Sequence, residues 1–235
     1  VKPGMTEQEM EAFYLYEFAK RGGRFSAYTP IVAGGENACV LHYVENSKPL
    51  LDGDLLLVDA GCEYDFYASD ITRTFPVSGR FTDPQLAIYE IVLEAQIKSI
   101  ESVSVNNNVM DAQIISEKVI TQGLIDLGIL TGSLDDLHAK GAFKEFYMHK
   151  IGHWLGIDVH DAGDYMEDDQ FMQFKPGMVT TIETGIYMPS AANVDDKWKG
   201  IGIRIEDDIM VTPDGNENLT EFVPSDPKEI EALMA

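Results

Sequence analysis

The sequence predicts a single α+β domain whose sheet is mixed, largely antiparallel and built from two related halves. Three observations support this fold class. Segments with helical periodicity alternate with β-rich segments, no low-complexity or Pro/Ser-rich linker interrupts them, and each half contains an apolar strand that ends in an acid. A chain of 235 residues with 45% hydrophobic side chains can bury one substantial core.

Three amphipathic helices are expected. The first begins after Thr6, which forms a capping-box pattern with Glu9, and ends before Gly22. The second begins after Thr82, and the third covers residues 109–127. In the first two helices apolar side chains recur at helical spacing, namely Met10, Phe13, Tyr14 and Phe18, then Leu86, Tyr89, Leu93 and Ile97.

Four segments are rich in β-forming residues and are predicted as strands. Asp-Gly pairs at positions 52–53 and 214–215 mark turns beside them. The predicted strands cover residues 25–33, 54–60, 178–183 and 200–211.

An internal repeat relates two of these strands. Each reads as a glycine turn, an apolar run, an acid and a glycine, and Glu183 repeats Asp59 at an offset of 183 − 59 = 124 residues. A second acid follows in each half, Asp70 and Glu206. If the repeat is a duplication, pseudo-twofold symmetry brings the two pairs of acids face to face. A chance recurrence of a common pattern is the alternative.

Charge and the lack of special segments limit the classes of function. Forty acidic against seventeen basic side chains give a formal net charge of −23, so neither nucleic acid nor an anionic membrane is an expected partner. No apolar stretch approaches the roughly 20 residues that span a bilayer. Cys39 and Cys62 form no disulfide or metal-binding pattern, which favours a reducing, cytoplasmic location. Because the chain begins in a Pro-Gly loop without Met, we expect an upstream segment.

Four acids and one histidine form a candidate metal site. Each acid alone would more often cap a turn and face water. Four carboxylates within about 4 to 5 Å would repel one another by about 3 to 4 kcal/mol per pair at an effective dielectric of about 20. Two divalent cations would balance this charge, and the donor types favour Mn, Co, Fe or Zn. The set is Asp59, Asp70, His153, Glu183 and Glu206.

Three further histidines are candidates for catalysis, namely His42, His149 and His160. A lone histidine is more often a hydrogen-bonded structural residue. An imidazole beside a metal site can instead move protons or hold a substrate carbonyl. His138, in a polar helix-end context, is expected to be incidental.

Together these residues resemble the catalytic domain of the Xaa-Pro aminopeptidase (aminopeptidase P) family. The resemblance covers essentially the whole chain and is carried by residues 59–61, 69–75, 149–161, Glu183 and 204–208. It implies a pita-bread fold, with residues 1–235 as a single catalytic domain that lacks the family's N-terminal domain. It also implies a homo-oligomer in the full-length form and two divalent ions, usually Mn²⁺, with Co²⁺, Zn²⁺ or Fe²⁺ as alternatives.

The activity implied by the resemblance is hydrolysis of the bond between an N-terminal residue and a penultimate proline. Asp59 would chelate one metal, Asp70 and Glu206 would bridge both, and His153 and Glu183 would complete the other. Glu183 would also act as general base on a bridging water and pass its proton to the proline nitrogen. The resemblance further implies that His42, His149 and His160 contact substrate or relay protons, and that Arg204 supports the carboxylates.

The sequence departs from the family pattern at three places. Thr184 stands where proline is usual, and Lys150 where glycine is usual. The loop from Asp164 to Phe174 carries acids but not the arginine expected to bind the far end of the peptide.

Two alternative functions are kept open. Prolidase is a dipeptidase with the same fold and a similar His-Trp/Phe-Leu-Gly turn. A catalytically silent peptide-binding module is less favoured, because all five predicted ligands are present.

Overall fold

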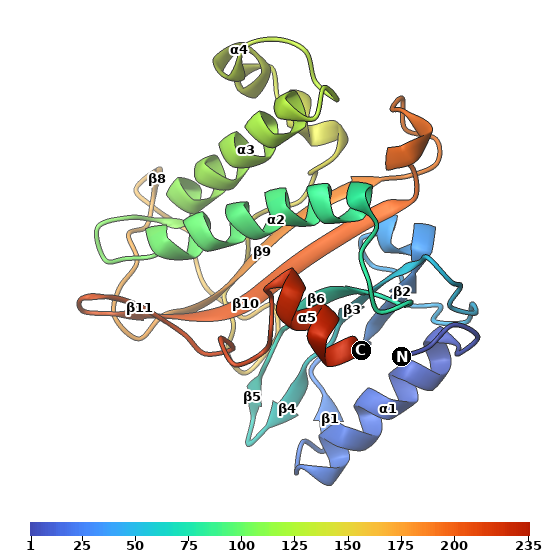
Figure 1. The fold of residues 1–235 in the computed structure, drawn as a ribbon. Helices are drawn as coiled ribbons and strands as arrows, with labels where there is room; N and C mark the ends of the chain where they lie inside the picture. The colour runs from blue at the N-terminus through green and yellow to red at the C-terminus, as the bar shows by residue number, and fades with distance from the viewer.

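The computed structural model describes residues 1–235, which form five α-helices and eleven strands (Figure 1). The helices are α1 (Glu7–Lys20), α2 (Asp83–Ser102), α3 (Val109–Asp126), α4 (Leu134–Ala139) and α5 (Pro227–Met234). The strands are β1 (Phe25–Ser26), β2 (Ile31–Gly34), β3 (Leu55–Asp59), β4 (Cys62–Tyr64), β5 (Tyr67–Ala68), β6 (Thr72–Pro76), β7 (Met166–Glu167), β8 (Gln170–Phe171), β9 (Val179–Met188), β10 (Ile201–Thr212) and β11 (Gly215–Asn218).

The three predicted helices are confirmed, and local chemistry sets where they begin. The side chains of Thr6 and Thr82 both accept the backbone N–H three residues ahead, and Glu9 and Gln85 bond back, which completes both capping boxes. Asn108 caps α3 in the same way. None of the helices combines the length and the apolar character needed to cross a membrane.

The predicted strand at residues 25–33 is wrong in extent. It is divided into β1 and β2, which belong to different sheets, and Pro30, which has no N–H to donate, lies between them. Strand β9 continues beyond the predicted Glu183 to Met188, because Ile186 and Met188 add to the core beneath α2. Strand β6 was not predicted as a strand.

The main sheet has the order β11-β10-β6-β3-β2, and β9 pairs with β10. All of these pairs are antiparallel. The pairs β3–β6 and β9–β10 correspond to the two related halves and meet where β6 pairs with β10. Strands β6 and β10 share only one register pair, Thr72 with Glu206, beyond which the Thr74 hydroxyl bonds both the N–H and the C=O of Arg204.

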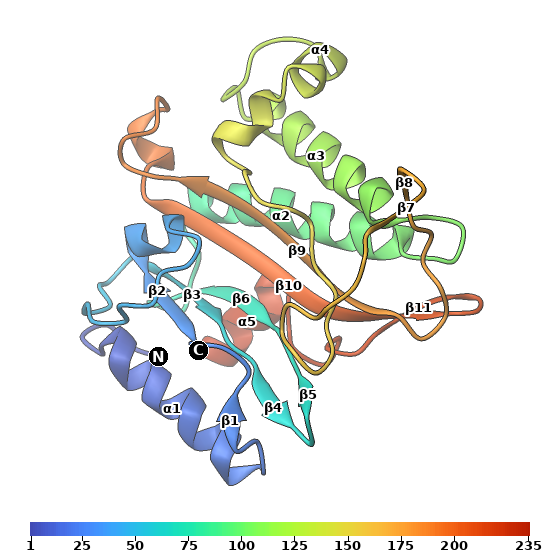
Figure 2. The same ribbon diagram turned by 180° about the vertical axis from the view of Figure 1, so that it is seen from behind.

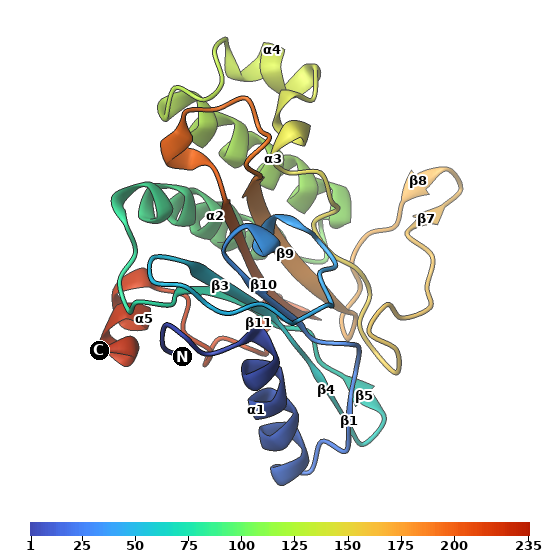
Figure 3. The ribbon, with the colours of Figure 1, turned by 90° about the vertical axis from the view of Figure 1, so that its right-hand side faces the viewer.

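Strand alternation divides the sheet into a helix face and a polar face. On β10, Ile201, Ile203 and Ile205 join the core that α2 and α3 cover. Arg204 and Glu206, which alternate with these isoleucines, face the opposite side. Figure 3 shows α2 and α3 on one side of β9 and β10 and the β7–β8 hairpin on the other.

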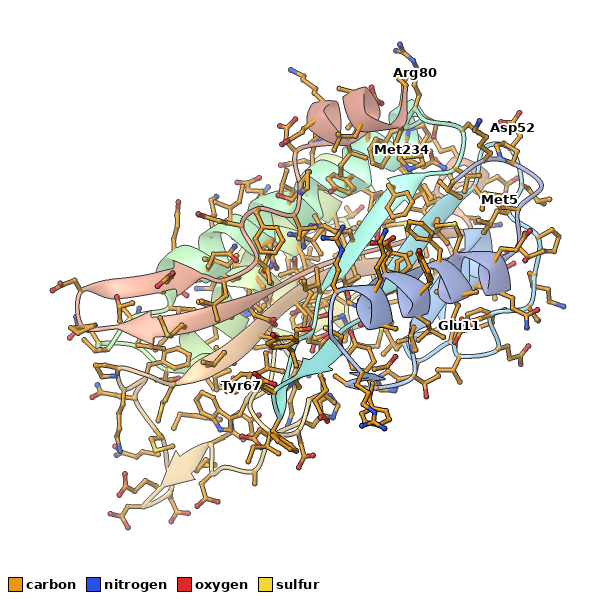
Figure 4. The ribbon with its side chains drawn as sticks, turned by 90° about the horizontal axis from the view of Figure 1, so that it is seen from below. Met5, Glu11, Asp52, Tyr67, Arg80 and Met234 are labelled. Carbon is orange, nitrogen blue, oxygen red and sulfur yellow. The ribbon has the colours of Figure 1, made fainter.

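The polar face is covered by the segment between α4 and β9, which crosses in front of β9 and β10 in Figure 2. Tyr67 of β5, labelled in Figure 4, donates its hydroxyl to the Leu155 carbonyl at 3.1 Å. The Ala68 N–H donates to the Gly156 carbonyl at 2.8 Å. These bonds fasten the covering segment to the N-terminal half.

Candidate metal centre

One row of paired residues runs across the sheet and carries three of the predicted ligands. Glu183 of β9 is paired with Glu206 of β10, Glu206 with Thr72 of β6, and Thr72 with Asp59 of β3. Cross-strand partners project to the same face at about 4.5 to 5.5 Å spacing. The acids are therefore brought together by strand register, although they are far apart in sequence.

Asp70 and His153 join the row from segments outside the strands. Asp70 precedes β6, and its Oδ2 lies 3.3 Å from His153 Nε2. Ligand atoms of Asp70, His153 and Glu206 all lie within 4.8 Å of one another. Together with Asp59 and Glu183, these residues line one cavity of about 490 Å³.

Two glycines allow the close backbone contacts that place Asp70 and His153. A Cβ on Gly61 would lie 1.6 Å from the Ser69 carbonyl oxygen, and a Cβ on Gly152 would lie 2.0 Å from the Thr181 carbonyl oxygen. A side chain at either position would push the adjacent ligand segment away from the sheet.

Neighbouring polar side chains form hydrogen bonds with the carboxylates. Arg204 Nη2 donates to Asp59 Oδ2 at 2.6 Å, and the Thr72 hydroxyl donates to Glu206 Oε2 at 2.8 Å. The Tyr28 hydroxyl oxygen lies 2.5 Å from Oδ1 of both Asp59 and Asp70. Three of the four acids, Asp59, Asp70 and Glu206, are thus oriented by a second residue, as is usual around protein-bound metals.

Crowding of acids in a buried site shifts their proton affinities. The pKa of Glu206 is raised well above its usual range, first by burial and then by the neighbouring charges of Asp70, Glu183 and Asp59. Burial also raises the pKa of Asp70, and it raises that of Glu183 to about 7. In the metal-free site the charged forms of these carboxyls are therefore disfavoured, and bound cations would favour them.

The donor set fits divalent cations. His153 Nδ1 lies 3.1 Å from the Trp154 carbonyl, which must accept its proton, so in the neutral ring the Nε2 lone pair faces the acids. Burial lowers the pKa of His153, but the hydrogen bond and charge of Asp70 outweigh it, so the net pKa is raised. Carboxylate oxygens and an imidazole nitrogen together form a donor set that suits divalent metal ions.

The three further histidines line the same cavity but differ in their contacts. His149 Nδ1 lies 2.9 Å from the Lys150 carbonyl, and Nε2 lies 2.9 Å from the Tyr187 hydroxyl. Tyr187 also accepts from Arg204 Nη1 at 3.0 Å. Burial, followed by the Arg204 charge, lowers the pKa of His149 to about 4, so its ring is neutral at physiological pH.

His42 and His160 are exposed and their ring nitrogens form no hydrogen bond within the chain. The His160 ring packs edge-on against His153 with a centroid separation of 4.2 Å. Burial and the neighbouring His153 lower the pKa of His160. His138 does not line the cavity, and its Nε2 lies 2.9 Å from Glu117 Oε2.

The departures from the family pattern fall on different faces. Thr184 faces α2, where its hydroxyl donates to the Val92 carbonyl at 3.1 Å, so it does not line the cavity. Lys150 does line the cavity. The segment 164–174 is not only loop, since it contains the β7–β8 hairpin, whose turn residues Asp168 and Asp169 both have positive φ.

Three supporting residues were missed by the sequence reasoning. Thr72 could have been found because it lies two residues after Asp70, which strand alternation places on the same face. Tyr187 could have been found in the same way, since it lies four residues after Glu183. Tyr28 follows no such pattern. Its hydroxyl reaches the site only because the chain bends between β1 and β2.

The fold and the site define a metallopeptidase: residues 1–213 match Metallopeptidase family M24, and the chain belongs to that family. The fold is the pita-bread fold of aminopeptidase P. The structure of proline aminopeptidase P II from Yersinia pestis superposes with a TM-score of 0.97 at 51% identity, over 99% of this chain and 53% of that chain.

Similar proteins are Xaa-Pro aminopeptidases. That of Haemophilus influenzae is 51% identical over 99% of this chain and 54% of its own length. A zinc-substituted aminopeptidase P from Escherichia coli, solved in complex with product, is 48% identical with a TM-score of 0.97, over 99% of this chain and 53% of that chain. The chain therefore spans about half the length of the relatives it matches.

Proposed function

We propose that residues 1–235 are the catalytic domain of a dinuclear, metal-dependent Xaa-Pro aminopeptidase. The substrates are peptides with proline at the second position, the metal is Mn²⁺, and the location is the cytoplasm. The observation that carries the proposal is the row of Asp59, Glu206 and Glu183, completed by Asp70 and His153 on one cavity. The similarity to Xaa-Pro aminopeptidases supports the choice of substrate.

Divalent ions held by Asp59, Asp70, His153, Glu183 and Glu206 would activate a water molecule and polarise the scissile carbonyl. Glu183 supplies the proton transfer. Its carboxylate would accept the proton of the activated water, the role of a general base placed beside it. The proline nitrogen is a poor leaving group until it is protonated, so the proton collected by Glu183 is delivered there.

The remaining side chains have two proposed roles. His42 and His160 present unengaged ring nitrogens at the cavity and are suited to hold the substrate carbonyl or transfer a proton. Arg204, Tyr187 and His149 form a chain of hydrogen bonds from Asp59 to the substrate side of the cavity. That chain fixes Asp59 and the neutral ring of His149 in place.

Peptide hydrolysis tests the proposed activity. The intact Mn²⁺-loaded protein should release the first residue from Ala-Pro-Leu and should not cleave Ala-Ala-Leu. Glu183→Gln should lower kcat by about 10² to 10⁴, the usual contribution of a positioned acid or base. Cleavage of the dipeptide Ala-Pro in strong preference to Ala-Pro-Leu would instead establish prolidase, and binding of both without cleavage by the metal-loaded protein would establish a silent module.

Metal counting tests the ligand set. We expect two Mn²⁺ per chain, and loss of both in Asp70→Asn or Glu206→Gln, because each is proposed to bridge the ions. Asp161→Asn, on the same cavity wall but outside the ligand set, is the control and should keep two. Two ions retained in the Asp70 and Glu206 variants would contradict the assignment.

A further inference from the structure

A second hollow adjoins the metal cavity. It has a volume of about 480 Å³ and shares four lining residues with that cavity, namely His149, Lys150, Gly152 and Tyr165. We call it the side groove. Its other walls come from the start of α3 and from the β7–β8 hairpin, which stands away from the sheet in Figure 3.

The side groove is lined by apolar side chains that the fold leaves uncovered. Met148 is 47% exposed, Met166 48% and Phe171 40%. Met166 and Phe171 are cross-strand partners in the β7–β8 hairpin, so they project to the same face. Side chains of this kind clustered beside a reaction centre form a favourable place to bury an apolar ligand group.

Lys150 lies at the junction of the two hollows and is the one cation there without a partner. Its ammonium takes part in no ion pair, whereas Arg204 is paired with Asp59. Within the side groove the Glu117 carboxylate is already engaged by His138 at 2.9 Å. Lys150 is the only lysine or arginine that lines the side groove, in a chain whose formal net charge is −23.

We propose that Lys150 and the side groove form the subsite for the substrate residue that follows proline, where Lys150 binds a carboxylate and the groove an apolar side chain. This inference rests on the proposed function. An aminopeptidase that removes one residue has only that residue on the amino side of the bond. A hollow of this size that continues from the metal site is therefore assigned to the carboxyl side. The carboxylate is either the C-terminus of a tripeptide or an acidic side chain.

The test compares Ala-Pro-Leu with a free C-terminus, Ala-Pro-Leu-amide and Ala-Pro-Glu-amide on the intact Mn²⁺-loaded protein. For Lys150→Met the ratio of kcat/KM between a carboxylate-bearing peptide and Ala-Pro-Leu-amide should fall about five- to tenfold, the scale of a partly exposed ion pair. Whichever carboxylate peptide loses its advantage identifies the source. Lys150→Arg should restore most of the ratio, and Lys144→Met, an exposed lysine outside both hollows, should leave it unchanged.

The groove is tested separately by Phe171→Ser, which should reduce the preference for Leu over Gly at the third position about threefold or more. Equal effects of Lys150→Met on all three peptides, or a groove variant that alters selectivity for the first residue instead, would overturn the subsite. Failure to cleave any Xaa-Pro peptide would instead reject the proposed function itself. Cleavage with unchanged ratios would reject only the subsite.

Discussion

The three histidines that line the cavity differ in whether their ring nitrogens are already hydrogen-bonded. Both ring nitrogens of His149 are engaged, by Lys150 and by Tyr187, and Tyr187 is in turn held by Arg204. The ring nitrogens of His42 and His160 form no hydrogen bond within the chain, and both residues are exposed. His149 is therefore fixed in the cavity wall by its hydrogen bonds, whereas His42 and His160 can bind a ligand through their ring nitrogens without breaking an internal hydrogen bond.

This contrast predicts separable effects of alanine substitution. His160→Ala should lower kcat/KM for Ala-Pro-Leu by about 10²-fold, with metal content and Tm unchanged. His149→Ala should also lower the free energy of unfolding by about 1 to 3 kcal/mol, because it leaves the Tyr187 hydroxyl without an acceptor in a buried place. Urea unfolding and steady-state kinetics on both variants check this. A destabilised His160→Ala with full activity per folded molecule would assign that residue a structural role.

At the scale of elements, β6 and β10 are held together by side chains more than by their backbones. Arg73 of β6 donates to Asp207 Oδ1 at 2.6 Å and to the Glu206 carbonyl at 2.7 Å, and it also reaches the Val223 carbonyl at 2.8 Å. The Arg73 side chain is only 9% exposed. It therefore fixes β10 and the segment that leads to α5 from the helix face.

Loss of the Arg73 side chain should lower the free energy of unfolding strongly. Arg73→Met leaves the buried Asp207 carboxylate without its cation, which typically costs about 3 to 5 kcal/mol. Arg80, exposed beside α5 in Figure 4, has no ion pair, so Arg80→Met should change stability by less than about 0.5 kcal/mol. Equal unfolding midpoints in urea for both variants would contradict this account.

Local chemistry explains which elements were predictable. The capping boxes of α1 and α2 are signals within four residues, so both helices could be predicted from sequence. Strand β6 was missed because its identity comes from its neighbours: Thr72 and Thr74 are polar, yet both are fully buried with their hydroxyls bonded to β10. The short β7–β8 hairpin likewise lacks an apolar run. The ligands could be predicted because each lies in a recognisable local sequence pattern. Tyr28 could not, because its role depends on contacts with Asp59 and Asp70 that no local pattern indicates.

For the whole molecule, the crowded acids couple stability to pH and metal. Burial raises the pKa of Glu183 to about 7 and that of Asp208 to about 8, whereas in the unfolded chain both acids titrate near pH 4. The folded metal-free protein therefore holds more protons than the unfolded chain between about pH 4.5 and 8, and its stability falls as pH rises through that range.

The expected result is a lower Tm at pH 8 than at pH 5.5 in the presence of a chelator. Mn²⁺ should remove most of this loss, because the cations displace the protons and bind more tightly as pH rises. Thermal unfolding in both conditions measures it. Glu183→Gln should show a smaller pH dependence without metal, and a Tm of the metal-free protein that rises between pH 5.5 and 8 would refute the explanation.

The metal site depends on the register between the two halves of the chain, because its ligands lie in one cross-strand row made of Asp59, Thr72, Glu206 and Glu183. Because the side-chain period of a strand is two, a slip of one residue in β6 against β10 would move the ligands of one half of the chain out of line with those of the other half. Only one backbone register pair opposes such a slip at that junction. Ions bound by ligands from both halves would stabilise the register of β6 against β10. Metal affinity would therefore fall with any substitution that shifts one half of the chain relative to the other.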